Sequence, residues 1–202
     1  MKNFPKAGLL IGTLVIPALI FLFLQLFARN HYDLPYFNPE LDENGKVVMQ
    51  NSDTVFHRLS EKQNTVAGYF FTGKWTVVSY LPVDCRDSCK LGFSQLQRIA
   101  ALGSELQDLH LLTLTSDLGK QKASMPELDM ANWEIKAAPE DGIAQFFKQE
   151  LGLKNAVTNS SACVLVDSKG FVRGHYQLTD PKETERLMAE IKILSYEGET
   201  TD

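Results

Sequence analysis

Two cysteines, Cys85 and Cys89, are the residues of this chain best suited to chemistry. They come soon after an apolar run, Trp75 to Leu81, which is rich in β-branched and aromatic residues and predicts a buried strand. Because they lie four residues apart, both side chains can occupy one face of a helix. Such a pair can close a disulfide, attack the disulfide of another protein, or bind a soft metal ion. A strand, a turn and then two cysteines is the arrangement of thioredoxin-type chemistry.

The residues beside the pair modulate its reactivity. A helix that begins here favours the thiolate form of the first cysteine. Asp84 and Asp87 oppose that effect, and the cations of Arg86 and Lys90 partly offset the two carboxylates. The alternative is a structural disulfide that only closes the turn. We favour the reactive pair, because cross-linking so few residues removes little entropy from the unfolded chain.

The N-terminus predicts a membrane anchor and an exported domain. Residues 7–28 carry no charge, and a helix of this length spans the roughly 30 Å hydrocarbon core of a bilayer. Lys2 and Lys6 precede this stretch, so we expect residues 1–6 in the cytoplasm and the rest on the periplasmic side of an inner membrane. A cleaved signal peptide fits less well, because the stretch is long and no Ala-x-Ala site follows it.

Composition and length limit the remaining classes of function. The net charge is -5, and no stripe of lysine and arginine interleaves with aromatic residues, so we expect no nucleic-acid partner. About 170 residues follow the anchor, which is enough for one well-packed domain. We expect a stalk over 29–53, a domain over 54–196, and a polar tail over 197–202.

The order of predicted elements indicates an α/β fold. A right-handed crossover makes the first two strands parallel, and a hairpin turn at Gly170 adds antiparallel strands. The expected architecture is a thioredoxin-like mixed sheet with helices on both faces, preceded by one transmembrane helix. The predicted strands are 75–81, 109–115, 133–135, 162–167 and 171–177, and the predicted helices are 91–106, 140–151 and one that begins at 181.

In these features the chain resembles the Sco/SenC family of membrane-anchored, copper-handling proteins with a thioredoxin-like fold. Family members show an apolar strand, then Cys-x-x-x-Cys and a helix, matched here by Val77 to Leu81, Cys85 and Cys89. They also show a hairpin in which an apolar run is followed by Asp or Asn, Pro or Ser, any residue and Gly. Val164 to Gly170 match that pattern. The likeness covers the anchor, the stretch from Asn30 to Pro35, and most of the domain.

The resemblance implies copper as the cofactor, bound by the two cysteines and one distant histidine. That histidine usually stands in Asp-His-Ser, upstream of the hairpin glycine, and this chain has Asn159 at the corresponding position. His175 is the best substitute ligand, because a tight hairpin at Gly170 would place it opposite Ala162 and at the same end of the strand as Asn159. The alternative is that His175 is a strand-edge histidine bonded to backbone or solvent.

The other chemically capable side chains have structural interpretations. Cys163 alternates with apolar residues in a predicted strand, where a small buried thiol is ordinary packing. His31, His57 and His110 are expected to be structural. Asp117 at the end of a strand could reach the thiol site, but an Asx-turn explains it equally well.

Our expectation is thiol–disulfide exchange by Cys85 and Cys89, in which one cysteine attacks and the other resolves the mixed disulfide. The resemblance implies a setting in the assembly of cytochrome c oxidase. The protein partner would carry a disulfide or copper-site thiols, such as an oxidase subunit. Two alternatives stay open: a Cu(I) chaperone that binds copper through the cysteine pair, and an assembly scaffold that keeps the fold without the chemistry.

Overall fold

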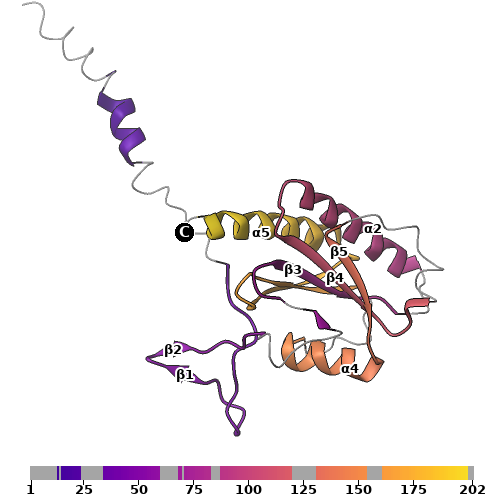
Figure 1. Cartoon of the computed structure of the whole chain (residues 1–202). Helices are drawn as coiled ribbons and strands as arrows, with labels where there is room; N and C mark the ends of the chain where they lie inside the picture. The colour runs from indigo at the N-terminus through magenta and orange to yellow at the C-terminus, as the bar shows by residue number, and fades with distance from the viewer. Residues whose placement is uncertain are drawn as a thin grey trace, which may run out of the picture. The chain divides into compact units, whose positions relative to one another are not determined.

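Figure 1 shows the computed structural model of the chain, which describes residues 13, 15–23, 34–59, 68–69, 71–82, 87–119, 131–153 and 161–199. The chain forms two compact units, Met1–Asp33 and Leu34–Asp202. In the first unit, residues 13 and 15–23 are helical. Among the described residues, no helix is long and apolar enough to cross a membrane. The predicted anchor, 7–28, reaches outside the described residues.

The second unit is built on a five-stranded mixed sheet with the strand order β5-β4-β3-β6-β7. Strands β3, β4 and β5 are parallel, β6 is antiparallel to β3, and β7 is antiparallel to β6. This arrangement confirms the thioredoxin-like mixed sheet, with β5 as a parallel edge strand. The strands are β3 (Trp75–Tyr80), β4 (Leu109–Thr115), β5 (Trp133–Ala137), β6 (Ala162–Val166) and β7 (Val172–Gln177).

Helices cover both faces of this sheet, as predicted. One face packs against α2 (Asp87–Ala101) and α5 (Pro181–Glu199), and the other packs against α4 (Glu140–Gln145) and the π-helix η3 (Phe146–Glu150) (Figure 1). A short 3-10 helix, η2 (Leu102–Ser104), follows α2. Two apolar cores result, one on each side of the sheet. Alternate residues of the central strands point into one core or the other.

Local signals explain where several elements begin and turn. Asp180 caps α5, because its Oδ1 accepts a 2.9 Å hydrogen bond from the backbone N–H of Lys182. Gly170 closes the β6–β7 hairpin with a φ of 88°. A Cβ atom at this position would lie 2.5 Å from the carbonyl oxygen of Leu59, so both the turn and the close approach of the chain require glycine.

Residues 34–53, which the sequence predicts as a stalk, belong to the domain unit instead. Leu34 is buried, and its carbonyl oxygen accepts a 2.7 Å hydrogen bond from Arg173. The backbone N–H of Phe37 donates to the carbonyl oxygen of Val172 at 2.9 Å. The Phe37 bond occupies part of the backbone edge of β7, and both bonds hold the segment on the domain. Two short strands, β1 (Met49–Gln50) and β2 (Asp53–Thr54), pair within it.

Candidate functional site

The cysteine site lies where β3 ends and α2 begins. Helix α2 starts at Asp87 and carries Cys89 in its first turn, at the sheet edge where the parallel strands β3 and β4 have their carboxyl ends. Cys89 is bonded in a disulfide. Cys85 lies outside the described residues, and so does Asn159. The replacement of the family's histidine by Asn159 therefore stays a prediction.

The side chain of Cys89 is shielded from solvent, with 1% of its surface exposed. It belongs to the core between the sheet and α2 and α5, together with Leu81, Phe93 and Leu178. A sulfur buried in this way can react with another sulfur of the same chain, whereas an external protein cannot reach it.

Buried hydroxyl groups form a polar row in this same core. The Oγ of Ser79 and the Oγ1 of Thr113 lie 2.8 Å apart, and Nε1 of Trp133 donates to Oγ1 of Thr113 at 2.9 Å. Ser79 is paired with Cys163, which belongs to the same core as Cys89. This row was not predicted from the sequence, although polar residues stand at inward positions of otherwise apolar strands.

Cys163 is a packing residue, as predicted. Its thiol is free and fully buried in the middle of the sheet. Burial raises the pKa of Cys163 far above its ordinary value, and the charge of Glu183 adds to the increase. A thiol that stays protonated in the core is a poor nucleophile, so Cys163 takes no part in the site.

His175, the predicted substitute copper ligand, faces the side of the sheet opposite the core that holds Cys89. Because Cys85 lies outside the described residues, the assignment of His175 as a ligand stays a prediction that this placement does not support. The hairpin pairs Val166 with Val172 and has a register shift between Leu165 and Val166, so His175 lies opposite Val164 rather than Ala162. Val164 belongs to the core on the α4 side of the sheet, whereas Cys89 belongs to the core on the α2 side.

The surroundings of His175 match the alternative interpretation of a histidine bonded to backbone. Its Nε2 lies 2.8 Å from the carbonyl oxygen of Leu151, so the ring donates this hydrogen bond. Burial lowers the pKa of His175, which favours the neutral ring. The ring also packs edge-on against Phe37, with 5.4 Å between the centroids.

Two further side chains, which the sequence singled out, make structural contacts. Nε2 of His57 lies 2.7 Å from a carboxylate oxygen of Glu150. Asp117 forms an Asx-turn, in which its Oδ1 accepts the backbone N–H of Gly119 at 2.9 Å. Within the described part of the chain, no group of three or more His, Cys, Asp or Glu side chains could hold a metal ion.

Several solved structures have a fold similar to that of this chain. No protein-family model and no curated protein matches the chain. The chain is similar to a SCO1/SenC family lipoprotein from Bacillus anthracis str. Ames, with 18% identity and a TM-score of 0.51 over 82% of this chain and 96% of the other. It is also similar to BsSco, described as a member of the Sco family of cytochrome c oxidase assembly proteins. That match has 16% identity and a TM-score of 0.53 over 81% and 96% of the two chains.

A third similar structure carries a name from disulfide chemistry. It is a protein from Chlorobium tepidum named for thiol:disulfide interchange (DsbE), with 16% identity and a TM-score of 0.50. The match covers 80% of this chain and 99% of the other. At such low identities these likenesses show the fold, a thioredoxin-like α/β domain that spans nearly the whole length of each relative.

Proposed function

We propose that this chain is a Sco/SenC-type protein that exchanges thiols and disulfides through Cys85 and Cys89. The observation that carries the proposal is the disulfide at Cys89, buried in the first turn of α2 at the carboxyl edge of a thioredoxin-like sheet. The chain has three cysteines, and Cys163 is free and buried in a strand. Cys85 is therefore the proposed partner of Cys89.

The burial of Cys89 assigns different roles to the two cysteines. In the proposed reaction, the Cys85 thiolate attacks one sulfur of the partner's disulfide, forms a mixed disulfide and releases the partner's first thiolate. The thiolate of Cys89 then attacks the sulfur of Cys85, closes the internal disulfide and releases the second thiolate. Two electrons pass from the pair to the partner. Cys89 suits the second step because only a sulfur of its own chain can reach it.

Thiol trapping of the full chain tests the pairing. The chain is equilibrated with reduced or oxidised dithiothreitol, quenched in acid, unfolded and labelled with a maleimide. We expect label on Cys85 and Cys89 only after reduction, and label on Cys163 in both samples, because Cys163 is free. Retention of label on Cys85 after oxidation would show that the proposed pair is wrong.

The proposed setting is the assembly of a respiratory copper site, as in the Sco proteins that the fold resembles. The support is structural likeness to BsSco together with the cysteine spacing in this chain. When reduced, Cys85 and Cys89 would offer two soft thiolates, which suit Cu(I) as a cargo. The placement of His175, on the other side of the sheet from Cys89, argues against an imidazole ligand from that residue. Dithiol exchange needs only the cysteine pair.

The substitution Asn159→His is expected to strengthen Cu(II) binding by roughly tenfold or more. An amide is a poor ligand for copper, whereas imidazole suits it, so the variant should gain a Cu(II)–thiolate absorption band in the reduced full chain. His175→Ala is the matched control and should leave the spectrum unchanged. A strong band in the unmodified chain that His175→Ala abolishes would contradict both expectations.

We further propose that residues 7–28 anchor the chain in an inner membrane, with the domain on the periplasmic side. The support is the absence of charge in this stretch and the lysines at positions 2 and 6. Protease added to spheroplasts should digest the domain, and the isolated protein should retain its N-terminal residues. Protection of the domain, or a mature chain that starts after Ala28, would exclude this topology.

A further inference from the structure

The segment 38–56, called here the arm, forms a small antiparallel ribbon that extends away from the five-stranded sheet (Figure 1). Its chain turns twice, at Asp42–Gly45 and at Asn51–Ser52, where both residues have positive φ. Residues that lie directly opposite in such a ribbon share a face, and so do residues two apart. The cross-strand pairs of one face are Pro39 with Phe56, Leu41 with Val47, and Met49 with Thr54.

This face of the ribbon is apolar and open to solvent. Leu41, Val47 and Met49 are 59%, 44% and 56% exposed. A soluble antiparallel ribbon normally buries one such face against its own core. Among the described residues of the unit Leu34–Asp202, five of the seven exposed large apolar side chains lie between residues 36 and 49. The five are Tyr36, Phe37, Leu41, Val47 and Met49, and the other two are Leu91 and Tyr196.

The apolar face continues into an aromatic hollow at the base of the arm. The ring of Tyr36 lies 5.4 Å, centroid to centroid, from those of both Phe56 and Phe171. These rings line an open hollow of about 410 Å³, together with polar residues that include Asn51 and Asp53. Exposed apolar surface and a concave aromatic site that meet in this way are features of protein-docking surfaces.

The charge of the arm selects among the surfaces that could cover it. It carries four carboxylates against one lysine, from Glu40, Asp42, Glu43, Asp53 and Lys46. Two arms of like charge repel each other, which disfavours a second copy of the chain, and the same charge disfavours an anionic lipid surface. A segment with positive charge would be attracted instead.

We propose that the arm binds an extended segment of a partner protein in which basic and apolar residues alternate. The apolar side chains of that segment would cover Leu41, Val47 and Met49, while its lysines or arginines would face the surrounding carboxylates. The arm joins the domain beside Val172 and Gly170, at the sheet end opposite Cys89. Docking there goes beyond thiol exchange and does not depend on it.

Fluorescence anisotropy with the full chain in detergent tests the proposal. The probe is a labelled short peptide in which lysine and valine alternate, and the comparison peptides alternate glutamate with valine or lysine with serine. We expect only the lysine–valine peptide to bind measurably, with an affinity that falls as salt rises. The double variant Leu41→Ser and Met49→Ser should weaken binding by roughly tenfold or more.

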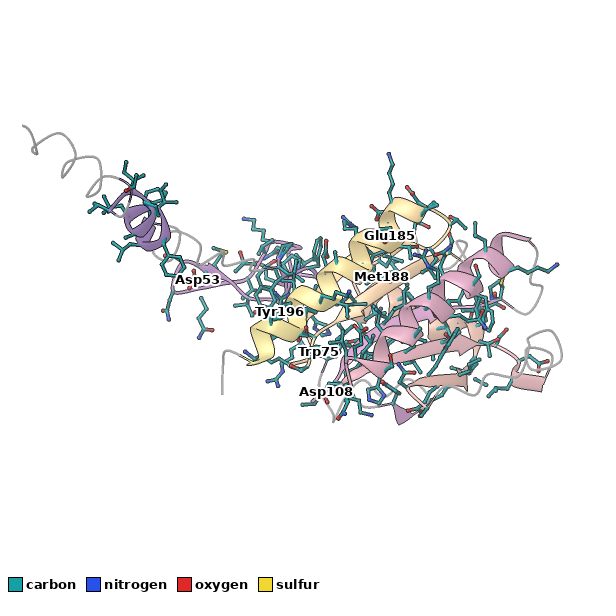
Figure 2. The ribbon with its side chains drawn as sticks, turned by 90° about the horizontal axis from the view of Figure 1, so that it is seen from above. Asp53, Trp75, Asp108, Glu185, Met188 and Tyr196 are labelled. Atoms are coloured by element: carbon teal, nitrogen blue, oxygen red, sulfur yellow. The ribbon has the colours of Figure 1, made fainter. Side chains whose placement is uncertain are left out.

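Two further variants separate charge from apolar contact. Glu43→Lys combined with Asp53→Lys should also weaken binding by roughly tenfold and remove most of its salt dependence. Tyr196→Ser is the matched control, because it removes an exposed apolar side chain from α5, outside the arm. Figure 2 labels Tyr196 and, on the arm, Asp53. Equal binding by all variants, or by the glutamate peptide, would overturn the proposal.

Two measurements identify the other occupants. If the chain sediments as a dimer and the double variant Leu41→Ser and Met49→Ser sediments as a monomer, the face binds a second copy of the chain. If brominated phosphatidylcholine quenches the fluorescence of a tryptophan introduced by Met49→Trp, the apolar face of the arm binds the bilayer. Either result would overturn the proposal, whereas a monomer without quenching supports it.

Discussion

Replacement of Cys89 by serine is expected to trap the chain on its substrate as a mixed disulfide. With oxidised glutathione as the probe, Cys85 can still attack, but no internal thiolate remains to release the adduct. Mass spectrometry should find one glutathione on Cys85. Reduction of insulin disulfides should fall by roughly two orders of magnitude or more in both Cys85→Ser and Cys89→Ser.

The two variants should differ in the adduct they form. In Cys85→Ser the pair retains only the sulfur of Cys89. Because Cys89 is 1% exposed, glutathione should not attach to it. Cys163→Ser is the matched control and should exchange at the unmodified rate, because Cys163 is free and buried. Glutathione found on Cys89 or Cys163 of the Cys85→Ser variant would refute the assigned order of attack.

Central strands and capped helices could be predicted from local pattern. The strand predicted at 109–115 has the same bounds as β4, because a run of apolar residues buried on both faces leaves little choice of structure. The start of α5 followed from Asp180 and Pro181, which are a cap and a first helical residue. The helix after the thiol pair was predicted at 91–106, but α2 spans Asp87–Ala101, so it begins four residues earlier and includes Cys89.

Long-range register and packing could not be predicted in this way. A tight hairpin at Gly170 would place His175 opposite Ala162, but a wider turn that pairs Val166 with Val172 and a register shift after Leu165 together place it opposite Val164. Hairpin composition alone does not reveal such a bulge.

The segment 34–53 contains the proline, asparagine and glycine residues that are typical of a linker, so its composition alone predicts a stalk.

The bonds that hold this segment to the domain lie far away in sequence. The side chain of Asn38 donates to the carbonyl oxygen of Glu150 at 2.8 Å, and the carbonyl oxygen of Leu34 accepts from Arg173. No local pattern shows them. The hydroxyl row at Ser79 and Thr113 was hidden for a related reason, because only the alignment of β3 with β4 brings these residues together.

Asp167→Asn is expected to cost about 3–5 kcal/mol of unfolding free energy, because it breaks a buried ion pair by removing the carboxylate beside a buried guanidinium. Oδ2 of Asp167 accepts a 3.0 Å hydrogen bond from Arg173, and both side chains are almost completely buried. Oδ1 accepts the backbone N–H groups of Lys169 and Phe171 at 3.0 and 2.9 Å. An asparagine oxygen can keep these two bonds, so the change is confined to the Arg173 side, where the variant removes the negative charge and sets an amide N–H donor against the guanidinium.

Thermal unfolding of the full chain, followed by circular dichroism, measures this cost. For a domain of this size the melting temperature should fall by about 6–20 °C. Glu185→Ala is the matched control. It breaks the pair with Arg98, which is 2.6 Å long but exposed on both sides, and Glu185 lies on the surface of α5 (Figure 2). That change should cost less than about 1 kcal/mol.

A second variant separates charge from packing at the same place. Arg173→Met added to Asp167→Asn removes the cation that has lost the carboxylate of Asp167, and it should recover part of the lost stability. The guanidinium of Arg173 also lies 4.3 Å from the ring centroid of Tyr36, so the double variant should still loosen the base of the arm. A loss below about 1 kcal/mol in Asp167→Asn alone would show that this buried pair does not hold the hairpin and the N-terminal segment together.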